Sequence, residues 1–228
     1  MNRIMIVSSF SLILASLFFV INDAIINFLS PLNIQFYHFV FYGSPAYLSV
    51  FIYLLFTNQF KSKLKSSNYL IPILRGLIFI PMPFLAFICL KQISLPEYTT
   101  LMMSAPMFSG ILAIIFLEER LNMYIISSLF LGFIGVLFVI QPGFENFNIY
   151  FLLVLFSALL IIITNILVNK YNTITSTEGF FVYGGIPIHL FCFFLFIINP
   201  IIINIKIYLM ITAASILVNT AIFLNIYA

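Results

Sequence analysis

The sequence contains very few charged residues. Asp, Glu, Lys and Arg make up only 7% of its 228 residues, whereas 64% are apolar. A typical soluble domain carries about 25% charged residues, so this chain has too little polar surface for a water-soluble globule. Its nine basic residues are scattered along the chain and form no basic patch, so no nucleic-acid partner is expected.

Cysteine and histidine are also scarce. Cys89 and Cys192 both lie inside apolar runs, which excludes a disulfide framework and predicts two buried free thiols. The two histidines belong to no Cys/His cluster, so no metal site is expected. The chain has no G-x-x-x-x-G-K loop for nucleotide phosphates. Its ionisable residues are isolated rather than clustered, which argues against an enzyme and against any cofactor.

Long apolar runs dominate the sequence. A bilayer hydrocarbon core of about 30 Å requires roughly 20 helical residues to cross it. Runs of this length predict an all-α polytopic membrane bundle, surrounded by a lipid bilayer, with eight transmembrane helices. The expected spans are residues 4–28, 34–56, 69–90, 96–117, 123–140, 149–169, 179–198 and 207–227.

The basic residues between these spans predict a cytoplasmic N-terminus. In that orientation the outer side receives only Lys91 and Lys206, and the positive-inside rule favours the side with more Lys and Arg as the cytoplasmic one. The basic residues placed inside are Arg3, Lys61, Lys63, Lys65, Arg120 and Lys170.

A short motif recurs in the chain. The motif beginning Tyr42-Gly43 and ending at Pro45 returns 141 residues later as Tyr183-Gly184, ending at Pro187. Five predicted helices separate the copies, so the second would be inverted relative to the first, as in many transporters. We expect one repeat over residues 1–147 and a second over 148–228. By the same offset the second would lack its last two spans; chance similarity and a natural eight-span bundle remain the alternatives.

Ionisable residues inside spans are the first candidates for function, because burying one unpaired is costly. Asp23 and His38 lie at similar distances from the turn at Pro31 and are candidates for handling a proton or a substrate. The alternative is that Asp23 is paired or neutral and only fixes two helices together.

Arg75, Glu118 and Glu119 are gate candidates. The two carboxylates lie at a predicted helix C-terminus, where the helix dipole disfavours negative charge, so they require a cationic partner. Arg75 or Arg120 would supply it, and an ordinary interfacial salt bridge is the alternative to a gate.

Three further polar residues lie deep in predicted spans. Asn165, His189 and Asn219 must hydrogen-bond inside the bundle or to water in a cavity, so they mark an interior face or line a substrate path. Glu97 instead fits a helix cap, because Ser94-Leu95-Pro96-Glu97 is a capping box.

Prolines within spans are helix-break candidates. Pro81, Pro83 and Pro106 each remove a backbone hydrogen bond. Irregular backbone at membrane depth is tolerated where protein or a water-filled cavity covers it. Simple packing kinks are the alternative.

Several short motifs, taken in order, resemble the EamA domain of the drug/metabolite transporter superfamily. None is specific alone, but their order and spacing carry the resemblance. They are Asn22-Asp23-Ala24, Arg75-Gly76, Ser94 to Glu97, Ala105-Pro106, Leu117 to Arg120, Gly132 with Gly135-Val136, and Gln141-Pro142-Gly143.

The resemblance implies ten helices in two inverted five-helix repeats in a bacterial inner (plasma) membrane. It further implies secondary transport of a small-molecule metabolite by alternating access, coupled to a proton, an ion or the substrate gradient rather than to ATP. A homo-oligomer is left open, and a non-transporting membrane scaffold or degenerate fragment is the alternative function.

Overall fold

The computed structural model describes residues 3–117, 122–140 and 148–227, which contain α-helices and no strand. Seven helical segments in this part are long and apolar enough to cross a membrane, and α8 contains a shorter apolar helix. The predicted class, an all-α polytopic membrane bundle, is confirmed. The helices are α1 (Arg3–Leu29), α2 (Phe36–Phe56), α3 (Phe60–Lys63), α4 (Leu70–Phe79), α5 (Pro81–Gln92), α6 (Leu95–Met102), α7 (Ala105–Leu117), α8 (Met123–Ile140), α9 (Ile149–Lys170), α10 (Thr177–Ile198) and α11 (Ile205–Tyr227).

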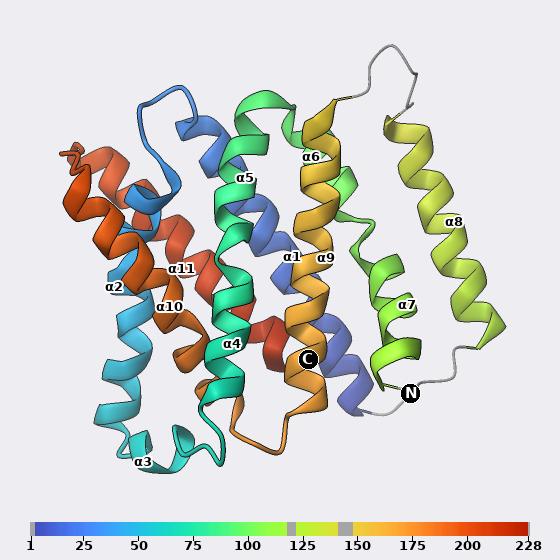
Figure 1. The fold of residues 1–228 in the computed structure, drawn as a ribbon, viewed down its shortest axis with the longest axis horizontal. Helices are drawn as coiled ribbons and strands as arrows, with labels where there is room; N and C mark the ends of the chain where they lie inside the picture. The colour runs from blue at the N-terminus through green and yellow to red at the C-terminus, as the bar shows by residue number, and fades with distance from the viewer. Residues whose placement is uncertain (1–2, 118–121, 141–147, 228) are drawn as a thin grey trace.

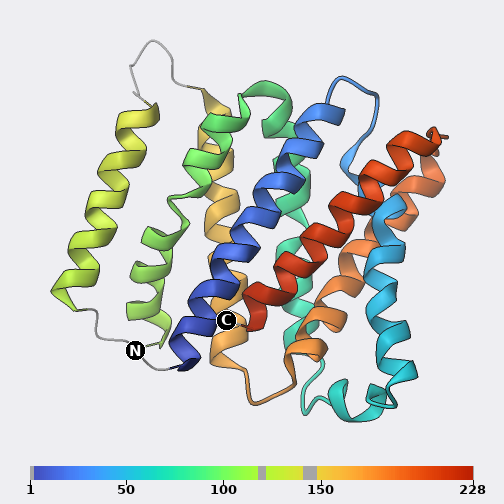
Figure 2. The ribbon, with the colours of Figure 1, turned by 180° about the vertical axis from the view of Figure 1, so that it is seen from behind.

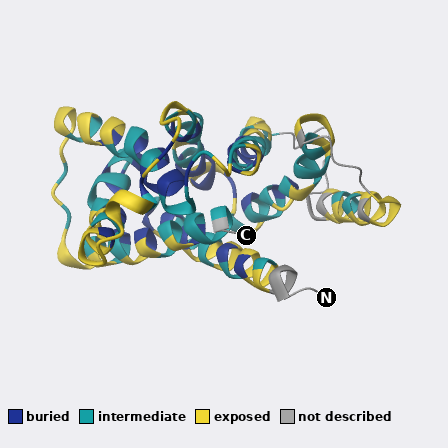
Figure 3. Ribbon diagram, turned by 90° about the horizontal axis from the view of Figure 1, so that it is seen from below, coloured by how far each residue is buried: buried dark blue, intermediate teal, exposed yellow. Residues whose placement is uncertain are grey.

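The helices form a broad bundle with α8 at one edge. In Figure 1, α2, α10 and α11 lie on one side, α4, α5 and α9 in the middle, and α7 and α8 on the other side. From behind, α1 and α11 run side by side across the bundle (Figure 2). Buried residues concentrate around the middle helices, whereas α8, which packs on α6 and α7, is largely exposed (Figure 3).

Two of the apolar segments are interrupted helices. Leu70–Gln92 divides into α4 and α5 at Ile80, and Leu95–Phe116 divides into α6 and α7 at Met103 and Ser104. Ile80 keeps helical dihedral angles (φ −53°, ψ −45°). The backbone therefore stays helical at the first interruption, and only its hydrogen bonding is broken. Pro81 causes this loss because proline has no N–H to donate.

The start of α6 has the predicted capping box. The Ser94 side chain accepts a hydrogen bond from the Glu97 N–H, and the Glu97 carboxylate accepts one from the Ser94 N–H at 2.8 Å. This pairing satisfies two donors that the first turn of a helix leaves free. The structure thus gives Glu97 a local structural role.

Two buried clusters hold the bundle together. The larger joins α1, α2, α5, α6, α9, α10 and α11 at the end of the bundle opposite α3. The smaller contains Tyr47, Leu54, Leu64, Phe181 and Val182 at the α3 end. Cys89 and Cys192 are buried and free, as predicted.

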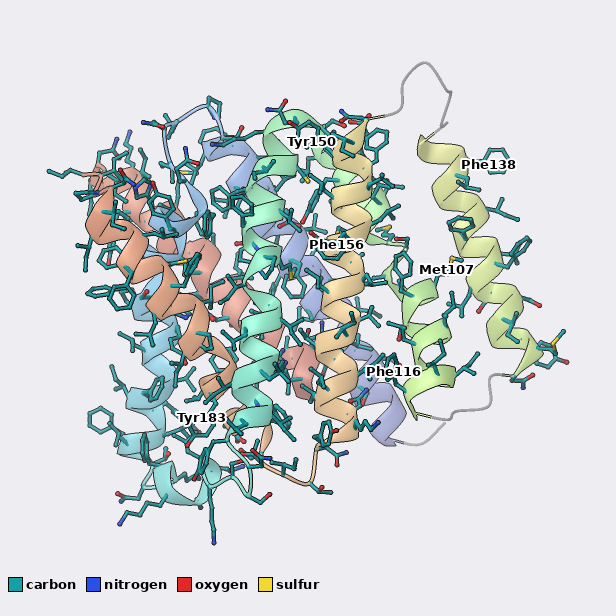
Figure 4. The ribbon with its side chains drawn as sticks, viewed as in Figure 1. Met107, Phe116, Phe138, Tyr150, Phe156 and Tyr183 are labelled. Carbon is teal, nitrogen blue, oxygen red and sulfur yellow. The ribbon has the colours of Figure 1, made fainter. Side chains whose placement is uncertain are left out.

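Two loops meet at the α3 end, and we call this contact the loop clasp (residues 63–67 with 174–178 and Tyr183). Figure 4 shows Tyr183 at this end of the bundle. The Lys63 ammonium pairs with the Glu178 carboxylate at 2.9 Å. The other bonds run from Ser67 N to Ile174 O (3.0 Å), Thr175 Oγ1 to Lys65 O (3.2 Å), Ser176 Oγ to Lys63 O (2.6 Å) and Tyr183 Oη to Leu64 O (2.7 Å).

Candidate functional site

Arg75 is the most unusual polar residue in the bundle. It lies five residues into α4, about 7.5 Å from the helix start at the α3 end. The residue is 5% exposed, and its Nε atom is buried without a hydrogen-bond partner. An unpaired guanidinium in a low-dielectric interior is costly, so this position requires an explanation other than packing.

The α4–α10 crossing places the Arg75 guanidinium. A Cβ atom added at Gly76 would lie 2.2 Å from the Gly184 carbonyl oxygen, so the two backbones are in direct contact. A Cβ atom at Gly184 would lie 2.9 Å from Arg75 Nη1. Glycine at both positions therefore allows the close helix approach and leaves room for the guanidinium.

Arg75 lines a small cavity, which we call the Arg75 cavity, where four apolar segments of the bundle meet. It has room for about one water molecule. Its apolar lining comes from α1, α4, α5, α9 and α11, and its polar lining comes from α4, α9 and α11. The lining residues are Phe19, Arg75, Phe79, Met82, Ile161, Thr164, Asn165, Ile222 and Asn225.

The polar side chains of this cavity form a partly satisfied network. Asn165 Nδ2 donates to Asn225 Oδ1 at 3.2 Å, and the Thr164 hydroxyl donates to the carbonyl of Ile161 at 2.7 Å. Two of the predicted site residues, Arg75 and Asn165, are thus brought together.

Asp23 lies four residues further along α1 than Phe19, and its carboxylate accepts a hydrogen bond from Asn22 Nδ2 at 3.3 Å. Asp23 is half-buried, whereas Asn22 is buried and its Oδ1 atom has no partner in the described structure. Asp23 is not among the residues that line the Arg75 cavity. The Asn22–Asp23 pair is therefore a second polar position, separate from the cavity.

His38 belongs to the start of α2 rather than to the Asp23 position. Its Nδ1 atom accepts a hydrogen bond from the Gln35 N–H at 3.0 Å, and its Nε2 atom lies 2.7 Å from the Asn199 carbonyl oxygen. Because the first contact requires an unprotonated Nδ1, Nε2 carries the proton and donates it. Both ring nitrogens are engaged with backbone groups, and they join α2 to the link before α11.

His189 and Asn219 also bond to their own helices. His189 Nδ1 lies 2.8 Å from the Gly185 carbonyl oxygen, and the imidazole stacks on the Tyr47 ring at 4.1 Å. Asn219 Nδ2 donates to the Ser215 carbonyl at 2.8 Å. Neither residue lines the Arg75 cavity.

The three proline candidates occupy different positions. Pro81 is the first residue of α5 and Pro83 its third, next to the cavity-lining Met82. Pro106 is the second residue of α7. Pro81 and Pro83 thus lie beside the Arg75 cavity. Because proline has no N–H group, carbonyl groups of α4 lose their usual hydrogen-bond donors there.

The proposed gate cannot be placed, because Glu118 and Glu119 lie outside the described residues, as does the Gln141-Pro142-Gly143 motif. The end of α7, marked by Phe116, lies on the other side of α9 from α4 (Figure 4).

A second hollow opens at the opposite end of the bundle. It is lined by aromatic rings, including Phe36 and Phe84 with centroids 5.1 Å apart, and by the Lys91 side chain. Its volume of about 130 Å³ makes it wider than the Arg75 cavity, which has about 10 Å³. The full lining is Gln35, Phe36, Phe84, Phe87, Ile88, Lys91 and Gln92.

A family model of EamA-like transporters matches residues 3–141, which is more than half of the chain. The chain belongs to the EamA-like transporter family. The match extends from α1 to α8 and includes Asp23 and Arg75. The predicted resemblance is confirmed, and membership of a transporter family together with the membrane-length helices identifies an integral membrane protein that lies in a lipid bilayer.

One relative of this EamA-like chain is a protein of Archaeoglobus fulgidus named an uncharacterized transporter. It is 33% identical over 90 residues, which cover 38% of this chain and 33% of the relative. The chain thus spans about a third of the length of the curated relative it matches. No solved structure matches. The family and the relative's name both point to a transporter rather than to an enzyme.

Sequence reasoning missed Thr164 and Asn225 as cavity residues of this EamA-like protein. A signal for Thr164 was present, because Thr164-Asn165 lies 142 residues after Asn22-Asp23, the same separation as that between the two motif prolines, Pro45 and Pro187. Asn225 had no such signal, since its place in the cavity follows from how α11 packs beside α9.

Proposed function

We propose that this protein is a secondary transporter of a small organic metabolite that works by alternating access between two inverted halves, residues 1–147 and 148–228. The observation that carries the proposal is a reciprocal helix pairing. α2 of the first half packs on α11 of the second, and α10 of the second packs on α4 of the first. If the two halves are related by a two-fold axis, the second span of each half would pack on the third span of the other in this way.

The close contacts at these two crossings support the same relation. Gly43 in α2 meets Ser215 in α11, where an added Cβ would lie 1.9 Å from Ser215 Oγ. Gly184 in α10, which lies 141 residues after Gly43, meets Gly76 in α4. In each half, the recurring Tyr-Gly motif therefore lies where one helix crosses a helix of the other half.

Coupling to a proton gradient is the second part of the proposal. Asp23 is half-buried in an apolar helix, and its carboxylate accepts a hydrogen bond from the Asn22 amide. An unpaired carboxylate charge in such a place is costly, so a proton that binds Asp23 and later leaves it would be a means of coupling. The sequence contains no nucleotide-phosphate loop, so a gradient is the energy source that the residues favour.

Flux into reconstituted vesicles tests the function. Vesicles containing the purified protein would be given a mixture of isotope-labelled amino acids and small organic acids, with and without an inward proton gradient. We expect protein-dependent uptake of at least one compound, and a loss of gradient dependence in Asp23→Asn, which keeps the side-chain volume. Uptake equal to that of protein-free vesicles for all compounds would favour the membrane scaffold instead.

Orientation in a plasma membrane, with the N-terminus and the loop clasp in the cytoplasm, is proposed from the basic residues. A cysteine at Ser62 should resist a membrane-impermeant thiol reagent in intact cells, whereas a cysteine at Ile202, in the exposed α10–α11 link, should react. The two native cysteines are buried, which keeps the background low. The reverse labelling pattern would place the N-terminus outside.

A further inference from the structure

The charge of Arg75 has no counter-charge in the described part of the chain. Each of the three carboxylates described there is engaged elsewhere. Asp23 accepts from Asn22, Glu97 accepts from Ser94, and Glu178 pairs with Lys63. A buried cation without a partner is strongly destabilising, so an anion from outside these residues is the simplest source of the missing charge.

The polar groups beside Arg75 present mainly donors. Asn165 uses one amide N–H on Asn225, and Asn225 accepts that bond through its Oδ1 atom. This arrangement leaves the second N–H of Asn165, the two amide N–H groups of Asn225 and Arg75 Nε as uncommitted donors on residues that line the cavity, against Asn165 Oδ1 as an uncommitted acceptor. The Thr164 hydroxyl hydrogen is already committed to the Ile161 carbonyl. A donor-rich cavity with one cation is suited to a negatively charged ligand.

We propose that the Arg75 cavity is a binding site for a compact monovalent anion, held by Arg75, Asn165 and Asn225. Size restricts the ligand, because the cavity has room for about one water molecule. A chloride ion or the carboxylate of a small organic acid shares the required charge and compactness. Both are larger than a water molecule, and the flexible Met82 side chain can move to admit them.

The site is independent of transport. The proposal concerns binding, so it stands whether or not labelled compounds cross the membrane in the vesicle assay. If the transported metabolite is the anion, this site supplies its contact with the carboxylate. If chloride is the anion, the site holds an ion that neutralises Arg75 in the middle of the bundle.

The test is anion binding to the purified protein in lipid nanodiscs. The buffer would contain gluconate as a bulky anion, and sodium chloride or sodium acetate would be titrated in while thermal unfolding is followed. We expect a saturable rise in the unfolding temperature, because a ligand that binds only the folded state stabilises it. Arg75→Met should abolish the rise, and Arg75→Lys should weaken binding about tenfold because it loses the fork of parallel donors.

Two further variants separate the site from general salt effects. Asn225→Ala should weaken binding several-fold and serves as the second probe if Arg75→Met does not fold. Lys63→Met removes an exposed cation of the loop clasp and should leave the anion response unchanged. Saturation by chloride with no competition from acetate identifies an inorganic ion, whereas competition between the two identifies carboxylates as ligands.

Two results would overturn the proposal. One is a wild-type protein with no saturable response to either anion, combined with a large loss of stability in the Glu118→Gln, Glu119→Gln double variant, which would assign the counter-charge of Arg75 to the α7–α8 link. The other is an Arg75→Met variant that folds and keeps the full chloride response.

Discussion

Arg75 and His38 are buried to almost the same degree, 5% and 4% exposed, yet their surroundings are opposite. At the α2 end, both nitrogens of His38 are bonded to backbone groups of Gln35 and Asn199. In the Arg75 cavity, Nε has no partner and the described carboxylates are engaged elsewhere. Burial of a polar group therefore does not by itself indicate function. The state of its hydrogen bonds separates a structural residue from a candidate for binding.

The largest expected effect is that of Arg75→Met on transport. If the transported solute is the anion held in the Arg75 cavity, loss of its buried charged contact costs about 2–5 kcal/mol, so flux in reconstituted vesicles should fall about 30-fold or more. The same variant should be at least as stable as the wild type in a gluconate buffer, because it removes an unpaired buried charge. A variant that loses stability and keeps its flux would give Arg75 the structural role assigned here to His38.

Gly76→Ala should have the largest effect on stability. The new methyl group would lie 2.2 Å from the Gly184 carbonyl oxygen, and forcing the helices apart should cost roughly 1–3 kcal/mol. Thermal unfolding in nanodiscs measures it. Gly132→Ala is the matched control, since a Cβ there meets nothing within 4 Å, and it should be neutral or slightly stabilising. Equal behaviour of the two variants would contradict the close α4–α10 crossing.

His38→Ala should cost about 1–2 kcal/mol of stability, because it leaves the Gln35 N–H and the Asn199 carbonyl without partners. His38→Gln keeps one donor and one acceptor and should recover part of this loss. The anion response should be unchanged in both variants. A changed anion affinity with no loss of stability would reverse the assignment of the two residues.

The smallest effect is expected at the loop clasp. The hydrogen bond from Lys63 to Glu178, followed by their charge attraction, raises the pKa of Lys63 above its usual 10.5. A raised pKa in the folded state means that the stabilisation is complete below the unfolded pKa and is lost as pH rises through the folded value. Because Lys63 is 42% exposed, Lys63→Met should change stability by less than about 1 kcal/mol. The pair requires both charges, so the difference from wild type should be constant across neutral pH and disappear in strong alkali, where Lys63 loses its proton, and in strong acid, where Glu178 gains one.

The helices could be predicted from the sequence because apolar run length sets the length of a membrane span. The run at 123–140 gives α8 with the expected bounds, and the run at 149–169 gives α9 with one residue more. Proline positions were less informative. Pro45 and Pro187 lie inside continuous helices, whereas Pro81 begins α5. Neighbouring helices decide which proline interrupts its span.

Only some residues of the candidate site could be predicted from the sequence. Arg75 and Asn165 are conspicuous as polar residues within apolar runs, so they could be selected. Asn225 could not be placed beside them, because its contact with Asn165 depends on the packing of α11 near α9. The sequence placed His38 and Asp23 at similar depth as candidates for handling a proton or a substrate, whereas the ring nitrogens of His38 bind the backbone at the start of its own helix and at Asn199.

The loop clasp has a consequence for the conformations that the protein populates. If transport proceeds by alternating access as proposed, a state open at the α3 end must break the hydrogen bonds of the loop clasp and the Lys63–Glu178 pair. Each contact contributes about 0.5–1.5 kcal/mol, so together they would favour the closed state. A solute that binds only the open state from this side would then show an apparent dissociation constant above its intrinsic value. Weakening the clasp would raise apparent affinity from one side of the membrane without changing any residue that touches the solute.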